Sequence, residues 1–171
     1  SQDFAEIILS TVATQVLTYG NRSVPKNLIL SELSWNEGFN RALQGLLRMG
    51  VLNISSIEHQ EYIGFEFHRF LLYFYAFKVL KLQTLPLEEQ VHTFQGLVQS
   101  PIGIEVLDFY LAAVDPRVGQ NVLTSLADLD LPLVAQILTG LKDVERYQKS
   151  PIPFDHVLLY LEFYNFLRDG F

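Results

Sequence analysis

Apolar residues in the first part of the chain recur at helical spacing in three successive segments. These segments cover residues 4–17, 25–33 and 34–49. Ser34 stands three residues before Glu37, which is the arrangement of a capping box, so we expect Ser34 to cap the third helix. The pattern therefore predicts three helices, with only a tight turn between the second and the third.

The period then changes from helical to alternating. Residues 51–54 are predicted to form a strand, residues 55–60 a polar turn, and residues 62–67 a second strand. Apolar residues return to helical spacing over 70–80. Three helices, a two-stranded hairpin and a further helix follow one another in the order of a winged-helix domain.

The second half of the chain predicts only helices. Prolines fall at spacings of 15, 15 and 16 residues and each precedes an apolar-periodic run, at Pro86, Pro101, Pro116 and Pro132. Ser100 and Asp115 stand directly before two of these prolines as candidate caps. A last helix is expected after Pro151 and Pro153. The predicted fold is mainly α, with a winged-helix-like N-terminal domain (1–82) and an antiparallel α-helical bundle or short solenoid (83–171).

Composition narrows the classes of function. Hydrophobic residues make up 49% of the 171 residues, which excludes a disordered chain. The net charge is −7, and the whole excess lies in 83–171, with five basic and twelve acidic side chains against seven of each in 1–82. An acidic chain is disfavoured as a nucleic-acid binder. The absence of cysteine excludes disulfides, thiol nucleophiles, iron–sulfur clusters and cysteine-ligated zinc.

No segment carries a complete catalytic or cofactor-binding motif. The densest group of metal-ligand types, Glu58, His59, Glu61 and His68, falls mostly in the predicted turn of the hairpin, which is usually solvated. We therefore expect no catalytic, cofactor or metal site. The most apolar stretch, 70–77, is too short to cross a membrane and no secretion signal is visible, so a cytoplasmic location is expected.

Aromatic residues are concentrated between 62 and 77. Most are expected in the core, and any that remain exposed would form a surface for a protein partner. The candidates for that surface are Tyr62, Tyr73, Tyr75 and Phe77. A cavity for a hydrophobic ligand, in a carrier or an enzyme, is the lesser alternative.

The third helix would be the recognition helix if the domain binds DNA. Its side chains suited to bases or phosphates are Asn40, Arg41, Gln44 and Arg48. Against this interpretation, Glu37 lies where base contacts are usually made, and Glu58 and Glu61 would bring negative charge to the phosphates.

Two phrases of the sequence resemble the winged-helix segment of STAND-type P-loop ATPases, the NACHT and AP-ATPase relatives. The first is Ala-Leu-Gln-Gly-Leu-Leu-Arg-Met-Gly-Val-Leu at 42–52, and the second is Phe-Glu-Phe-His-Arg-Phe-Leu-Leu-Tyr-Phe-Tyr-Ala at 65–76. The resemblance implies that His68 can approach a nucleotide, that the nucleotide-binding module is absent from this chain, and that the acidic helices are a regulatory or sensor region.

The function expected from the sequence is a non-enzymatic regulatory or adaptor module that binds a protein partner. The alternatives are a winged-helix transcriptional regulator that reads DNA, and a carrier or enzyme with an aromatic-lined pocket. The sequence leaves the oligomeric state open.

Overall fold

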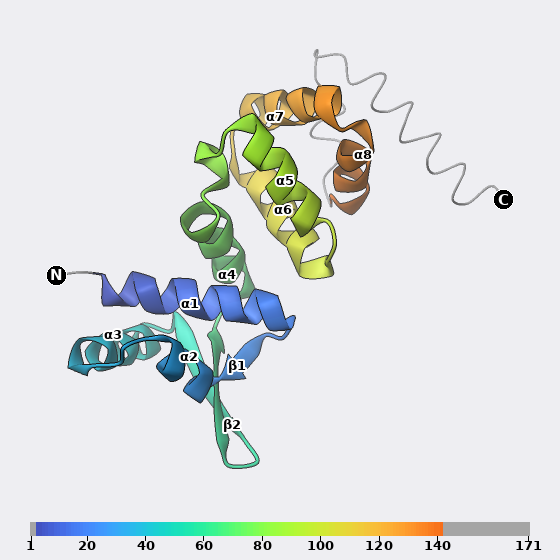
Figure 1. Cartoon of the computed structure of the whole chain (residues 1–171). Coiled ribbons are helices and arrows are strands. Elements are labelled where there is room, and N and C mark those ends of the chain that lie inside the picture. The colour runs from blue at the N-terminus through green and yellow to red at the C-terminus, as the bar shows by residue number, and fades with distance from the viewer. Residues whose placement is uncertain (1–2, 142–171) are drawn as a thin grey trace. The chain divides into compact units, whose positions relative to one another are not determined.

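The computed structural model of the chain describes residues 3–141 (Figure 1). In that range the fold is mainly α, with eight α-helices and one small three-stranded antiparallel sheet. The chain divides into two compact units, Ser1–Lys81 and Leu82–Phe171. The predicted fold class is confirmed, although the sheet has one strand more than the expected hairpin.

The first unit follows the predicted order of helices and hairpin. Its elements are α1 (Phe4–Tyr19), β1 (Ser23–Pro25), α2 (Lys26–Glu32), α3 (Glu37–Arg48), β2 (Leu52–Ile57), β3 (Gln60–Phe65), α4 (His68–Phe74) and a π-helical turn, η1 (Tyr75–Val79). The strands lie in the order β1-β3-β2, and both pairings are antiparallel.

Helix α1 is the centre of the first core. Ile8, Val12 and Val16 are fully buried, and α1 contacts α3, α4, β1 and β3. The ring of Phe39 from α3 stacks on Trp35, with centroids 5.4 Å apart. The rings of Phe4 and Phe39 meet edge to face, with their centroids 4.6 Å apart. This cluster fixes α3 against α1, and it leaves the opposite face of α3 to solvent.

The predicted capping box at the start of α3 is wrong. The cap is Asn36, whose side-chain oxygen accepts the backbone N–H of Phe39 at 3.0 Å. Asn36 stands directly before the first helical residue, whereas Ser34 lies in the preceding turn. Asparagine is at least as good a cap as serine, so the nearer side chain satisfies the free N–H.

The hairpin is longer and its turn tighter than the pattern predicted. Only Glu58 and His59 form the turn, with φ of 50° and 66°. Two successive residues with positive φ match the twist of a two-residue hairpin. The strands therefore run to 57 and from 60, and Phe67 lies outside the sheet with 66% of its surface exposed.

The strand that the sequence pattern did not predict is β1. Val24 pairs with Ile63 and is almost completely buried. Gly64 makes the close pairing possible, since a Cβ there would stand 2.5 Å from the carbonyl oxygen of Arg22. A glycine inside a strand often marks such a backbone approach.

The second unit is a helical array, as predicted. It contains a short 3-10 turn, η2 (Leu82–Thr84), and the helices α5 (Leu87–Leu97), α6 (Pro101–Ala113), α7 (Pro116–Leu129) and α8 (Leu131–Gly140). Helix α5 packs on α6, α7 on α8, and α6 on α8. Its core includes Phe94, Leu107, Tyr110, Leu123 and Val134.

The caps of these helices confirm part of the proline prediction. The side chains of Ser100 and Asp115 accept backbone N–H groups of Gly103 and Arg117 at 3.0 and 2.9 Å. Pro101 and Pro116 are the first residues of α6 and α7, whereas Pro86 occupies the cap position before α5 and Pro132 is the second residue of α8. The helix expected after Pro151 and Pro153 lies outside the described residues.

Candidate functional site

The four residues predicted as nucleic-acid contacts, Asn40, Arg41, Gln44 and Arg48, are all exposed on α3. Asn40, Gln44 and Arg48 are spaced by four residues and therefore form one stripe along the helix. Arg41 is paired with Glu37, with Nε 3.5 Å from Oε1. Both partners of this pair are exposed, so the pair adds little stability, but Glu37 offsets the positive charge of Arg41 on the exposed surface of α3.

The hairpin carries negative charge at its tip. Glu58 and Glu61 are exposed, and Glu61 pairs with Lys26 at the start of α2, with Nζ and Oε2 3.4 Å apart. Farther along the hairpin, Asn53 donates a hydrogen bond to the carboxylate of Glu66 at 2.8 Å. A phosphate backbone approaching this hairpin would meet carboxylates whose charge is only partly balanced.

The aromatic residues predicted as a partner surface differ in exposure. Tyr73 is 40% exposed, whereas Tyr62, Tyr75 and Phe77 are half-buried. Tyr75 packs against the core of the first unit, and this burial raises the pKa of its hydroxyl above 10.0. The rings of Tyr73 and Phe77 lie 5.3 Å apart.

Three exposed apolar side chains lie where α3 ends and α4 begins. Met49 is 72%, Phe67 66% and Phe70 37% exposed. A hydrogen bond from the N–H of Glu66 to the carbonyl of Val51, at 3.0 Å, brings these two segments to the same end of the hairpin. We call Met49, Phe67 and Phe70 the hairpin-base surface. The sequence pattern named none of the three as a contact, because their exposure depends on where the strands end.

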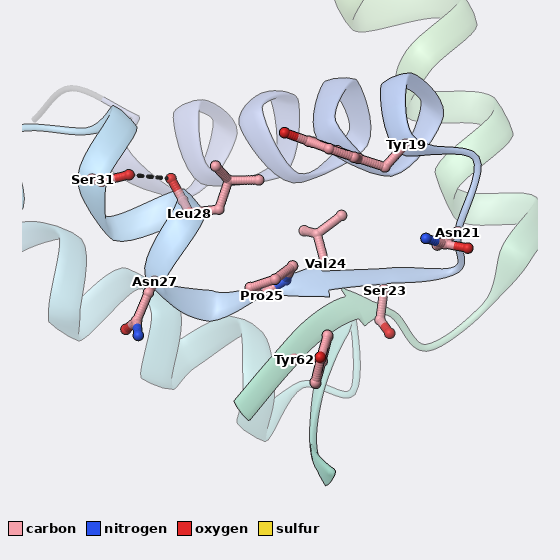
Figure 2. Close-up of a pocket in the computed structure, with 9 residues that line it drawn as sticks. All are labelled: Tyr19, Asn21, Ser23, Val24, Pro25, Asn27, Leu28, Ser31 and Tyr62. Carbon is pink, nitrogen blue, oxygen red and sulfur yellow. Dashed lines mark hydrogen bonds between the residues drawn. The ribbon is translucent and has the colours of Figure 1, made fainter. Parts of the chain in front are cut away.

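A groove of about 660 Å³ lies along β1 (Figure 2). It is lined by the end of α1, by the loop that follows α1, by β1, by α2 and by one residue of β3: Tyr19, Asn21, Ser23, Val24, Pro25, Asn27, Leu28, Ser31 and Tyr62. We call it the β1 groove. Of these residues only Tyr62 was a candidate from the sequence, because the groove exists only where β1 joins the sheet.

A smaller and more polar cavity of about 290 Å³ adjoins the β1 groove through their shared residue Asn27. Its lining includes Lys26, His59 and Glu61. Among residues 3–141, no three side chains of histidine, aspartate or glutamate are placed to share a metal ion. In the same range, no helix is long and apolar enough to cross a membrane.

Comparisons with models of protein families, with curated proteins and with solved structures find no significant match.

Proposed function

We propose that the chain is a cytoplasmic, non-enzymatic regulatory or adaptor module whose winged-helix-like first unit binds a protein partner. The order of helices and strands in the first unit supports the winged-helix part of this proposal. The resemblance of residues 42–52 and 65–76 to the winged-helix segment of STAND ATPases is retained as part of the proposal on the strength of those two sequence phrases alone.

The observation that carries the proposal is the hairpin-base surface. Met49 and Phe67 expose most of their surface, and Phe70, three residues after Phe67, is 37% exposed. Large apolar side chains gathered at one place on a protein surface mark interaction sites, because covering them with a partner removes apolar area from water. A methionine and two phenylalanines also match the composition of interface cores.

The charges on the neighbouring elements favour protein over DNA. Arg41 and Lys26, on the elements that a winged helix presses against DNA, are each paired with a carboxylate. Association with a duplex would have to separate these pairs or carry the carboxylates toward phosphate.

The test is capture of partners from an extract of the cells that make the protein. Wild-type chain is compared with a Met49→Ser, Phe67→Ser double variant and with a Val118→Ser, Leu129→Ser double variant as the control. Val118 and Leu129 are 46% and 57% exposed and belong to the second unit, so the control also removes two exposed apolar side chains. We expect one or more proteins to be recovered with wild type and with the control, and to be lost with the Met49→Ser, Phe67→Ser variant. Equal recovery with all three chains would contradict the proposal.

The exposed stripe of Asn40, Gln44 and Arg48 supports DNA binding as the second candidate function. A duplex-binding titration against salt separates the two, because phosphate contacts weaken as salt rises. Binding that strengthens as salt is lowered, and that is reduced by Arg48→Ala, would favour this second function.

A further inference from the structure

We propose that the β1 groove binds a short, uncharged, proline-rich segment of a partner protein in the polyproline II conformation. The proposal rests on the proposed protein-binding function, but the groove shares no residue with the hairpin-base surface. The two sites can therefore be tested separately.

The charge of the groove selects an uncharged occupant. None of its nine lining residues carries a charge, and nearby Lys26 is already paired with Glu61. A charged side chain or a phosphate entering the groove would lose water without gaining an opposite charge. The electrostatic complement of this groove is therefore a neutral segment.

The edge of β1 disfavours an occupant that adds a strand to the sheet. The strand has only three residues, and it ends in Pro25, which has no backbone N–H to donate. Strand addition depends on a row of main-chain donors and acceptors. A peptide in this groove must therefore be held mainly by side chains.

The polar side chains of the groove suit a chain that offers carbonyl groups. Tyr19, Asn21 and Asn27, which are among the lining residues, each carry a side-chain donor. Ser31 already donates to the carbonyl of Leu28 at 2.9 Å, so we assign it no role in binding (Figure 2). A polyproline II segment has no internal hydrogen bonds, and its carbonyl groups are free to accept such donors.

The rings of the groove suit proline. Figure 2 shows the side chains of Tyr19 and Tyr62 on either side of β1. Tyr19 is 57% exposed, and Tyr62 stands opposite Pro25 in the sheet register. Tyrosine-lined grooves bind proline-rich segments because the rigid segment loses little entropy when its rings pack on the aromatic faces. The volume of about 660 Å³ accommodates a short segment of this kind.

The test is a titration of the ¹⁵N-labelled full chain with hexaproline that is acetylated and amidated at its ends, followed by NMR. We expect amide shifts to change at Ser23, Val24 and Tyr62. We also expect Tyr19→Ala, a change at an exposed position, to raise the Kd by about tenfold. Tyr62→Phe keeps the ring, removes only the hydroxyl, and should raise the Kd less. Met49→Ala, on the hairpin-base surface, should leave the Kd unchanged.

Three results would overturn the groove proposal. They are an absence of shift changes at the groove, an unchanged Kd in Tyr19→Ala, and equally strong binding of a Gly-Ser peptide of the same length. If hexaproline fails while the hairpin-base variants still lose their partner, only the groove proposal fails. If hexaproline binds as expected and the hairpin-base variants keep their partner, the failure concerns the hairpin-base surface.

Discussion

Replacing Gly64 with alanine tests the pairing of β1 with β3, on which both the sheet and the β1 groove depend. The new Cβ would lie 2.5 Å from the carbonyl oxygen of Arg22 and 3.2 Å from the Cβ of Ser23. The first of these neighbours is backbone and has no rotamer by which to move away. The strand itself must therefore shift.

Two opposing effects decide whether Gly64→Ala stabilises or destabilises the first unit. Replacing a glycine within a strand gains about 0.5–1 kcal/mol, because the unfolded chain loses freedom. Forcing an atom into a filled site costs about 1–3 kcal/mol. Because the clash is with backbone, we expect its free-energy cost to exceed the gain from the reduced freedom of the unfolded chain. Gly64→Ala should therefore destabilise the first unit by about 1–2 kcal/mol.

Gly45→Ala is the matched control. Gly45 lies inside α3, and a Cβ there would meet no atom within 4 Å. The control should therefore stabilise the unit by about 0.5–1 kcal/mol.

Urea unfolding followed by the fluorescence of Trp35 measures both variants, since this single tryptophan is partly buried and packs against the core of the first unit. A Gly64→Ala variant as stable as wild type, beside a stabilised Gly45→Ala, would refute the close approach of β1.

Three further predictions concern ionisation, capping and charge. Burial raises the pKa of Tyr75, so its hydroxyl ionises in the unfolded chain at a lower pH than in the folded chain. The contribution of Tyr75 to stability should therefore be complete below about pH 10 and should be lost as the pH rises toward the folded pKa. When urea midpoints are compared from about pH 8 to 11, the midpoint should fall less in Tyr75→Phe than in wild type. An equal fall in both chains would contradict this origin. In urea unfolding, Asn36→Ala should lower the free energy of unfolding by about 1 kcal/mol, whereas Ser34→Ala should change it by no more than about 0.5 kcal/mol. Equal losses in the two variants would contradict the observed cap. In a titration with duplex DNA, we expect no binding that becomes tighter as the salt concentration is lowered. Salt-sensitive binding that is weakened by Arg48→Ala would count against the protein-binding account.

The order of the first unit could be predicted because long apolar periods decide helix against strand. Ile8, Val12 and Val16 recur at helical spacing and are all buried, so the pattern and the core agree. Short local choices were less predictable. Both Ser34 and Asn36 can cap a helix, and only the geometry of the turn before α3 selects Asn36.

Strand β1 could not be predicted from its own residues. Three residues give no period, and Pro25 argues against a central strand. What holds β1 is its pairing with a strand almost forty positions later in the sequence, at Ile63. The one local indication was Gly64, a glycine inside an alternating strand, which can mark the approach of another backbone.

The candidate sites divide in the same way. The exposed face of α3 follows from helical spacing, so Asn40, Gln44 and Arg48 could be placed together from the sequence. The hairpin-base surface and the β1 groove depend on where strands end and pair, which is decided by contacts distant in sequence. Phe67 shows this most clearly, because the predicted second strand runs to residue 67, whereas β3 ends at Phe65 and leaves Phe67 66% exposed.

The most direct test of the proposed function is photo-cross-linking from position 67 in the cells that make the protein. A photoreactive benzoylphenylalanine replaces Phe67, and a second chain carries it at Leu129 as the control. The account predicts a discrete protein adduct from position 67 that is absent from position 129. Adducts to nucleic acid alone, or the same protein adducts from both positions, would contradict it.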